Sequence, residues 1–197
     1  MQQLTSTVAR SPRYEAMSQT SRKSPVLDAL VDLFYQSTSD LGTFDEVSPD
    51  DAPAPFDQLL AHDQHMTVTV EKFHDSPVNV EVIDVRQTPS HYARKILLRR
   101  QSDGKVVQFG LVRLCLDFLE ADVRREIESQ QTPLGRVLIE HNVLREVQLI
   151  SLWKVTCGAE LRQLFGLENS DATYGRTALI YCNGVPAVEL LEIVTPL

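Results

Sequence analysis

Two charged residues occupy positions where the surrounding pattern calls for apolar side chains. In the run YARKILL, strand alternation places Arg94 on one face with Tyr92 and Ile96. In the run VELLEIV, the same alternation places Glu192 on a face with Leu190. A buried charge is costly unless it is paired or meets a charged ligand. A guanidinium and a carboxylate facing one core therefore predict a site for a small acidic molecule with a second polar group.

The same pattern has a structural interpretation, which the residues alone leave open. Arg94 and Glu192 would then pair with each other as a buried salt bridge. Perturbed charges do not separate the two cases, because structural ion pairs show the same signature as functional sites. Arg136 and Arg176 are interpreted as surface charges or as partners of carboxylates.

The elements that would position these residues follow from hydrophobic periodicity. Period-two alternation predicts strands, and apolar spacing of three to four residues predicts helices. The predicted strands are 66–73, 78–86, 91–100, 106–114, 143–156, 174–182 and 185–194. The predicted helices are 26–35, a short turn at 56–61, 119–129, a helix capped by Thr132 with Pro133 in its first position, and 159–165.

Turn residues join these elements into hairpins. Asp103-Gly104 predicts a tight two-residue loop between two of the strands, and Asn183-Gly184 predicts the last hairpin. Gly166 is expected to cap the helix before it. Strands joined by hairpins, with a helical insertion between them, predict an α+β protein with an antiparallel sheet.

Composition divides the chain into three parts. Residues 1–24 are rich in Ser, Thr, Gln and Arg and predict a flexible N-terminal arm. Residues 25–57 contain the first helix and an acidic, proline-rich stretch, of which 36–55 is predicted as loop. Residues 58–197 form the predicted main domain.

Charge and cysteine content exclude several classes of function. The net charge of -8 gives no support to nucleic-acid binding, although a locally positive pocket can still take an anion. The three cysteines have no metal-ligand spacing, which favours a reducing cytoplasmic compartment without disulfides or zinc. Of the five histidines only His62 and His65 are spaced like a ligand pair. Because no third ligand accompanies them, they are interpreted as solvated loop histidines. No apolar run approaches the ~18 residues of a membrane span, and no phosphate loop or nucleophile elbow is present.

Several segments resemble the chorismate–pyruvate lyase family, and they occur in the family's order. The resemblance covers residues 58–196 and leaves the first 57 residues unmatched. The segments are 63–67 (DQHMT), 92–98 (YARKILL) followed by Asp103-Gly104, 109–112 (FGLV), 132–136 (TPLGR) and 191–196 (LEIVTP). Arg94 and Glu192, already identified by strand alternation, lie in two of them.

This resemblance implies a cofactor-free, metal-free monomeric lyase that converts chorismate into 4-hydroxybenzoate and pyruvate, the first committed step toward a ubiquinone or plastoquinone head group. It also implies one highly twisted antiparallel sheet with helices packed on it and an internal ligand cavity under helical flaps. Arg94 would hold the ring carboxylate and Glu192 the ring hydroxyl. Backbone amides near Met66 and Leu134 would close on the ligand, and Gly110 would leave room beside the ring.

Two other functions remain open at this point. The same type of fold resembles the ligand-sensing domains of one class of bacterial repressors, which would bind a small anion without converting it. A related enzyme could also produce a different hydroxybenzoate from chorismate. Fold alone does not separate these functions. For the lyase we expect Arg94→Ala to abolish binding and turnover, and Glu192→Gln to slow the reaction while sparing the fold.

Overall fold

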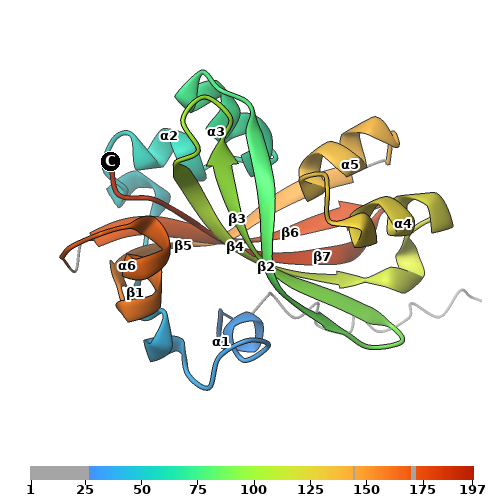
Figure 1. Ribbon diagram of the computed structural model, residues 1–197, viewed down its shortest axis with the longest axis horizontal. Coiled ribbons are helices and arrows are strands. Elements are labelled where there is room, and N and C mark those ends of the chain that lie inside the picture. Colours follow the sequence, from blue (N-terminus) through green and yellow to red (C-terminus); the bar gives the residue numbers. More distant parts are fainter. Residues whose placement is uncertain (1–26, 144, 170–171) are drawn as a thin grey trace, which may run out of the picture.

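The computed structural model describes residues 27–143, 145–169 and 172–197. They form one strongly twisted, antiparallel, seven-stranded sheet with helices on both faces, in the strand order β1-β5-β6-β7-β4-β3-β2 (Figure 1). The strands are β1 (Gly42–Val47), β2 (Val78–Gln87), β3 (His91–Arg100), β4 (Val106–Cys115), β5 (Arg145–Cys157), β6 (Ala172–Cys182) and β7 (Val185–Val194). The predicted α+β architecture with one antiparallel sheet is confirmed.

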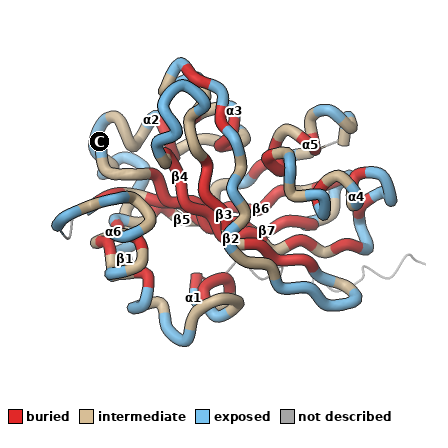
Figure 2. The backbone as a smooth tube through the Cα atoms, in the orientation of Figure 1, coloured by how far each residue is buried: buried red, intermediate tan, exposed pale blue. Residues whose placement is uncertain are grey.

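The helices divide between the two faces of the sheet. They are α1 (Leu27–Val31), α2 (Phe56–Leu60), α3 (Met66–His74), α4 (Ala121–Ser129), α5 (Leu134–Glu140) and α6 (Ala159–Phe165), with 3₁₀ helices η1 (Thr38–Asp40), η2 (Pro49–Asp51) and η3 (Leu116–Phe118). Helices α1 and α6 pack on the face that carries Leu97 and Leu111. Helices α4 and α5 pack on the opposite face, with Tyr92 and Val112, and α2 and α3 pack on a neighbouring cluster with Ile96. The central strands are therefore buried along most of their length (Figure 2).

The two predicted hairpins both form, but only one has the expected length. Asn183 and Gly184 join β6 to β7 with backbone φ angles of 52° and 81°, the positive values that a tight two-residue turn requires. Between β3 and β4, residues 101–105 form a longer loop in which only Gly104 has a positive φ, of 72°. The Asp103 carboxylate accepts a hydrogen bond from the Lys105 amide in this loop. The two-residue length predicted there was wrong.

The segment predicted as the strand 66–73 is instead helix α3. Its buried residues Met66, Thr67 and Val70 share one helical face, while Val68 and Phe73 are 43% and 41% exposed. β-Branched residues favour strands only weakly, and packing against the sheet decides the outcome here. The alternation of Met, Val and Thr was therefore a misleading signal.

A strand lies inside the stretch 36–55 that was predicted as loop. β1 pairs antiparallel with β5 at the edge of the sheet, with Phe44 opposite Val155. The strand is short and half-exposed and carries Asp45 and Glu46, features that protect a sheet edge from pairing with another chain. The acidic residues led us to predict a loop here. The structure shows a strand whose Phe44 packs against the core.

The remaining elements agree with their predicted positions within a few residues. The helix α6 ends at Gly166 with φ of 70°, as predicted. The first helix, predicted over 26–35, is limited to α1 within the described part of the chain. Pro133, rather than Thr132, is the N-cap of α5. The predicted arm 1–24 lies outside the described residues.

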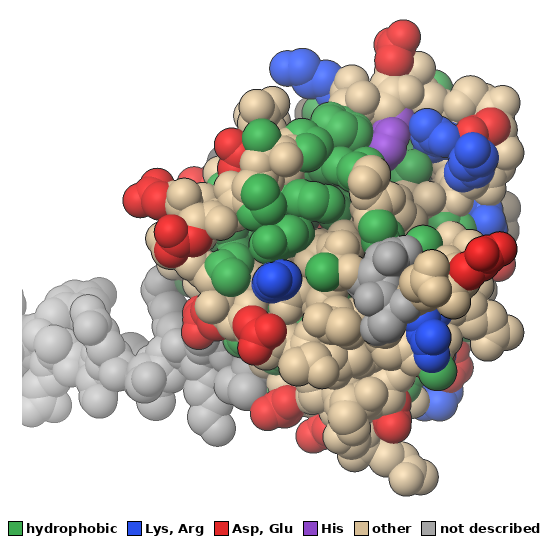
Figure 3. Space-filling model, turned by 90° about the vertical axis from the view of Figure 1, so that its left-hand side faces the viewer, with side chains coloured by type: hydrophobic (Ala, Val, Ile, Leu, Met, Phe, Trp, Pro, Cys, Tyr) green, Lys and Arg blue, Asp and Glu red, His purple; other side chains and the backbone are tan. Residues whose placement is uncertain are grey.

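The outer surface shows features that are separate from the site below. Hydrophobic side chains gather on the side that carries β1, α6 and the C-terminus (Figure 3). A surface groove of about 790 Å³ lies between the β3–β4 loop, the end of α6 and the C-terminal residues. It shares no residue with the cavity that is described in the next section.

Among the described residues, no helix is long and apolar enough to cross a membrane, and no cluster of His, Cys, Asp and Glu could hold a metal ion.

Candidate functional site

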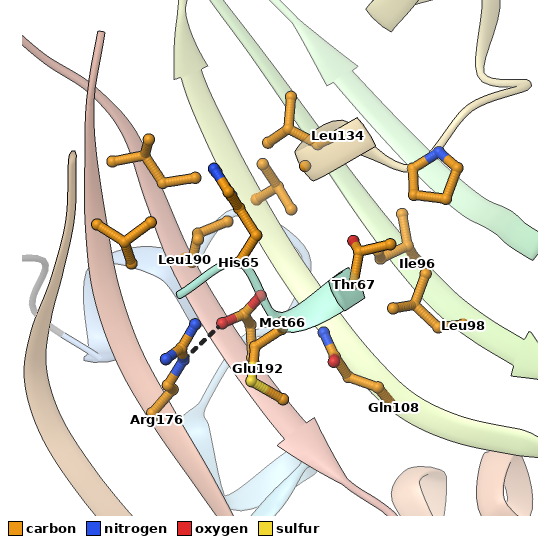
Figure 4. Close-up of a pocket in the computed structure, with 15 residues that line it drawn as sticks. His65, Met66, Thr67, Ile96, Leu98, Gln108, Leu134, Arg176, Leu190 and Glu192 are labelled. Carbon is orange, nitrogen blue, oxygen red and sulfur yellow. Dashed lines mark hydrogen bonds and ion pairs between the residues drawn. The ribbon is translucent and has the colours of Figure 1, made fainter. Parts of the chain in front are cut away.

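A small cavity lies between the sheet and the first residues of α3 and α5 (Figure 4). Strands β3, β4, β5, β6 and β7 also contribute to its wall. About 30 Å³ is open to the centre of a water molecule, which is room for roughly two waters. Pockets for small organic ligands measure roughly 300 to 1,000 Å³. A benzoate-sized ligand therefore requires the residues that line the cavity to rearrange.

Arg94 lies in the row of the sheet beside this cavity. The register of β3 and β4 places Arg94 opposite Val112 and Ile96 opposite Gly110, and both Val112 and Ile96 line the cavity. The Arg94 side chain is 0% exposed. None of its three guanidinium nitrogens has a hydrogen-bond partner among the described residues.

The environment of Arg94 favours an anionic ligand. Burial lowers the pKa of Arg94, and the nearby Tyr92 acts in the opposite direction. An arginine nonetheless keeps its proton in a protein, so this core contains a cation with unsatisfied donors. The buried Tyr92 hydroxyl lies near this guanidinium but forms no hydrogen bond of normal geometry among the described residues. A carboxylate placed here would accept the guanidinium donors and offset the cost of burying the charge.

Glu192 lines the cavity, and its partner is Arg176 rather than Arg94 (Figure 4). The two residues face each other across β6 and β7, and Arg176 Nε donates to Glu192 Oε2 at 2.8 Å. The structural alternative, a salt bridge between Arg94 and Glu192, was therefore wrong. Of the two interpretations of Arg176, the carboxylate partner is confirmed, and the side chain is fully buried. Strand alternation with Ala178 and Ile180 was the signal that could have identified it.

The remaining donors of Arg176 hold the connection between α2 and α3 against the sheet. Nη1 donates to the carbonyl oxygens of Leu60 at 3.4 Å and His62 at 2.7 Å. Nη2 donates to the carbonyl oxygen of Gln64 at 2.9 Å. Because this connection leads directly into α3, the pair of Arg176 and Glu192 also positions the start of α3 over the cavity.

Met66 and Leu134 begin the two helices that cover the cavity, and both line it. The first amides of a helix have no partner inside the helix, so backbone donors of α3 lie at the cavity. Gly135 permits a close approach of the two helices, because a Cβ there would lie 3.2 Å from the nearest α3 side-chain atom. Across the same contact, Arg136 Nη2 donates to Glu71 Oε1. This ion pair joins α3 and α5 into one cover.

Gly110 and Gln108 lie in the strand β4 beneath the cavity. A Cβ on Gly110 would lie 3.1 Å from Cγ1 of Ile96, so the space beside Gly110 holds the Ile96 side chain. Gln108 lines the cavity, is 2% exposed and has an Oε1 atom without a hydrogen-bond partner among the described residues. We did not predict a role for Gln108 from the sequence, although it alternates with Gly110 and Val112 on a buried face.

His65, which was interpreted as a solvated loop histidine rather than a metal ligand, forms part of the cavity wall. It precedes α3 as the N-cap residue, and its Nε2 accepts a hydrogen bond from Arg145 Nε at 2.8 Å. Burial, together with the positive charges of Arg145 and Arg176, lowers the pKa of His65 to about 4. The imidazole is therefore neutral at pH 7.

The low pKa of His65 predicts a loss of stability in mild acid. In the unfolded chain the imidazole takes up a proton near pH 6.5, whereas in the folded protein it does so near pH 4. Over this window the unfolded state binds more protons, so the free energy of unfolding falls as pH falls. We expect the melting temperature to decrease from pH 7 to pH 4.5, and to decrease less in His65→Gln, whose amide oxygen can still accept from Arg145.

The matched control is His91→Gln, because His91 is exposed at the start of β3 and its ring contacts Ser90 instead of Arg145. Its melting temperature should follow the wild-type pH dependence in a thermal scan. Equal slopes for wild type and His65→Gln would show that His65 does not contribute to this dependence.

Comparisons with known proteins identify the fold. No family model matches the sequence, and no curated protein matches it. The effector domain of PhnF from Mycobacterium smegmatis is similar in structure, with a TM-score of 0.51 and 10% identity over 67% of this chain and 88% of that chain. Intact PhnF gives a TM-score of 0.50 and 10% identity over 66% of this chain and 63% of that chain. A GntR-family transcriptional regulator from Enterococcus faecalis gives a TM-score of 0.41 and 10% identity over 59% of this chain and 92% of that chain.

These likenesses concern the fold and not the activity. The chain spans 63% of the length of intact PhnF, less than two thirds. At 10% identity the similarity shows a shared arrangement of sheet and helices, and function depends on the site built on it. The chain therefore shares its arrangement of sheet and helices with the effector domain of PhnF. Beside its cavity lies a buried arginine without a hydrogen-bond partner among the described residues.

Proposed function

We propose that this protein is a chorismate–pyruvate lyase that binds chorismate in the cavity and releases 4-hydroxybenzoate and pyruvate. The observation that carries the proposal is the buried guanidinium of Arg94, which has no partner among the described residues and lies one row from the cavity that Glu192 lines. A ring carboxylate is a ligand that would satisfy this cation. Glu192 would meet the hydroxyl at the other end of the ring.

The positions of the family-like segments support this proposal. Met66, Leu134 and Glu192 come from three distant segments and line one cavity. Arg94 and Gly110 lie in the adjoining strands, each directly beside a lining residue. An effector-binding module would need a cavity and a cation such as Arg94. It would not need the Glu192 carboxylate in the cavity wall to act as a base.

The chemistry asks for positioning and for proton transfer. The ring hydrogen at the hydroxyl-bearing carbon leaves as a proton, and its bonding electrons complete the aromatic ring. The bond between the ring and the enolpyruvyl oxygen breaks at the same time, and the released enolate gains a proton to become pyruvate. Aromatisation supplies much of the driving force, so Arg94 and the covering helices contribute mainly by orienting the substrate.

Glu192 is arranged to take part in that proton transfer. One of its carboxylate oxygens accepts from Arg176, which fixes the orientation of the group. The second oxygen makes no hydrogen bond within the described residues and belongs to a side chain that lines the cavity. This oxygen would accept the hydrogen bond of the substrate hydroxyl and act as the base at the neighbouring ring carbon.

A second candidate function is a ligand-binding module that does not convert its ligand. The likeness to the effector domain of PhnF favours it. The same cavity and the same Arg94 would then bind a small aromatic acid, and the rearrangement of the lining residues would signal that binding to a partner domain. In that case Glu192 would be needed only for the buried pair with Arg176.

One assay separates the two functions. Purified protein is incubated with chorismate, without added metal or nucleotide, and the products are followed by liquid chromatography. Equal amounts of 4-hydroxybenzoate and pyruvate, absent with Arg94→Met, would support the lyase. Another hydroxybenzoate would retain the enzyme and change its regiochemistry. Unchanged chorismate, together with thermal stabilisation by 4-hydroxybenzoate, would support the binding module.

A further inference from the structure

An open groove of about 760 Å³ adjoins the internal cavity. It lies between the start of α3, the end of α5 and the start of β5, and it shares His65 and Val147 with the cavity wall. The two spaces are therefore separated by these side chains. The groove and the cavity meet at His65 and Val147.

Arg145 lies at this junction, at the first position of β5. Its side chain lines the groove, and strand alternation places it on the same face as Val147. Nε donates to His65 Nε2 at 2.8 Å and Nη1 donates to the Val143 carbonyl oxygen at 3.1 Å. Nη2 donates no hydrogen bond within the described part of the chain. The guanidinium is partly buried, so its charge is less screened than that of a surface arginine.

The three arginines around the cavity differ in the donors that they can offer. Arg94 lies deep in the core with all its nitrogens unpaired among the described residues. Arg176 already donates to Glu192 and to three carbonyl oxygens. Of these three, Arg145 is the one that lines the groove and also has a guanidinium nitrogen, Nη2, without a hydrogen bond among the described residues.

We propose that Arg145 binds the second carboxylate of a dianionic ligand, at the junction of the cavity and the groove. This inference rests on the proposed function, because chorismate carries a ring carboxylate and an enolpyruvyl carboxylate, whereas 4-hydroxybenzoate carries one. With Arg94 on the ring carboxylate, the enolpyruvyl carboxylate needs a second cation, and Arg145 lines the groove that adjoins the cavity. Asp63 and Glu146 also line the groove, and Arg145 is the only arginine or lysine among the described residues that line it.

The arrangement distinguishes substrate from product. Arg145 contributes to the affinity for the dianion and contributes little to the affinity for the monoanion. Once the enolpyruvyl group has left as pyruvate, the remaining 4-hydroxybenzoate is held from the Arg94 side alone. Arg145 is thus a substrate-selecting residue, and Arg94 is shared by substrate and product.

Binding of two ligands tests this role without depending on turnover. Isothermal titration compares 4-hydroxybenzoate with 3-carboxymethoxy-4-hydroxybenzoate, a stable dianion that places a second carboxylate where chorismate has its enolpyruvyl arm. In Arg145→Gln we expect the dianion to bind about 10- to 100-fold more weakly, the loss of one charge-assisted hydrogen bond. The affinity for 4-hydroxybenzoate should stay within about twofold, which also shows that the variant is folded.

Two further variants make the result specific. Arg145→Lys keeps the charge without the planar fork and should recover part of the preference for the dianion. Arg125→Gln removes an exposed arginine paired with Asp122 on α4 and should bind both ligands like the wild type. For chorismate itself, Arg145→Gln should raise KM while kcat changes little.

The outcomes separate this inference from the proposed function. An unchanged preference for the dianion in Arg145→Gln, with normal turnover of chorismate, would overturn the role of Arg145 and leave the lyase intact. A lost preference without any turnover in the wild type would retain the Arg145 site and reject the lyase. Failure of the wild type to bind either ligand would reject both.

Discussion

Replacing Arg94 with methionine is expected to abolish ligand binding and turnover while raising the stability of the free protein. The guanidinium is fully buried and has no hydrogen-bond partner among the described residues. Methionine fills a similar volume without a charge or an unsatisfied donor. Leaving buried polar groups unpaired costs roughly 1–3 kcal/mol, and more when the group is charged. We therefore expect the free energy of unfolding to rise by at least about 1 kcal/mol.

Urea denaturation measures the change in the free energy of unfolding, and ligand titration measures the loss of binding. The control is Arg113→Met, because Arg113 lies on the other face of β4 and is partly exposed in an ion pair with Glu189. That variant should change stability by less than about 1 kcal/mol and leave binding intact. Turnover of chorismate by Arg94→Met, or a large loss of its stability, would show that Arg94 is a structural residue.

Replacing Glu192 with glutamine is expected to damage both the fold and the reaction. From the sequence alone this variant was expected to spare folding. The structure changes that expectation, because Glu192 is the carboxylate partner of the fully buried Arg176. Removing one member of a buried pair leaves an uncompensated charge and costs roughly 3–5 kcal/mol. Loss of the base should also reduce kcat by about 10²- to 10⁴-fold.

A double-mutant cycle separates these two effects. The cycle compares Arg176→Met and Glu192→Leu with the variant that carries both substitutions. Both charges are gone in the double variant, so it should be more stable than either single variant. It should remain inactive, because the carboxylate is missing whether or not the fold recovers. Destabilisation that simply adds up over the two positions would show that the pair is not coupled in the way its 2.8 Å hydrogen bond indicates.

The pair also explains why stability and activity are linked at this site. Arg176 holds the carbonyl oxygens that precede α3 as well as the carboxylate of Glu192. Loss of the pair should therefore loosen the start of α3, which forms part of the cavity wall. Residual ligand binding by the double variant measures how far the position of α3 depends on the pair of Arg176 and Glu192.

The sequence by itself determined most of the sheet and the burial of both charged candidates. Hairpins such as Asn183-Gly184, and helix ends such as Gly166, depend on the backbone angles that a few adjacent residues can adopt. Strand alternation likewise placed Arg94 and Glu192 on buried faces, because the two sides of a strand are set by its own geometry. These features are local, so neighbouring residues suffice to encode them.

Only the tertiary structure decided the partners and the covering elements. The same strand pattern could not tell that Glu192 would pair with Arg176 and that Arg94 would have no partner among the described residues, because partners depend on the order of the strands. The segment that begins at Met66 alternates like a strand but forms a helix, because packing over the cavity outweighs a weak β-propensity. The contact of His65 with Arg145 joins residues 80 positions apart, and only chain folding brings such groups together.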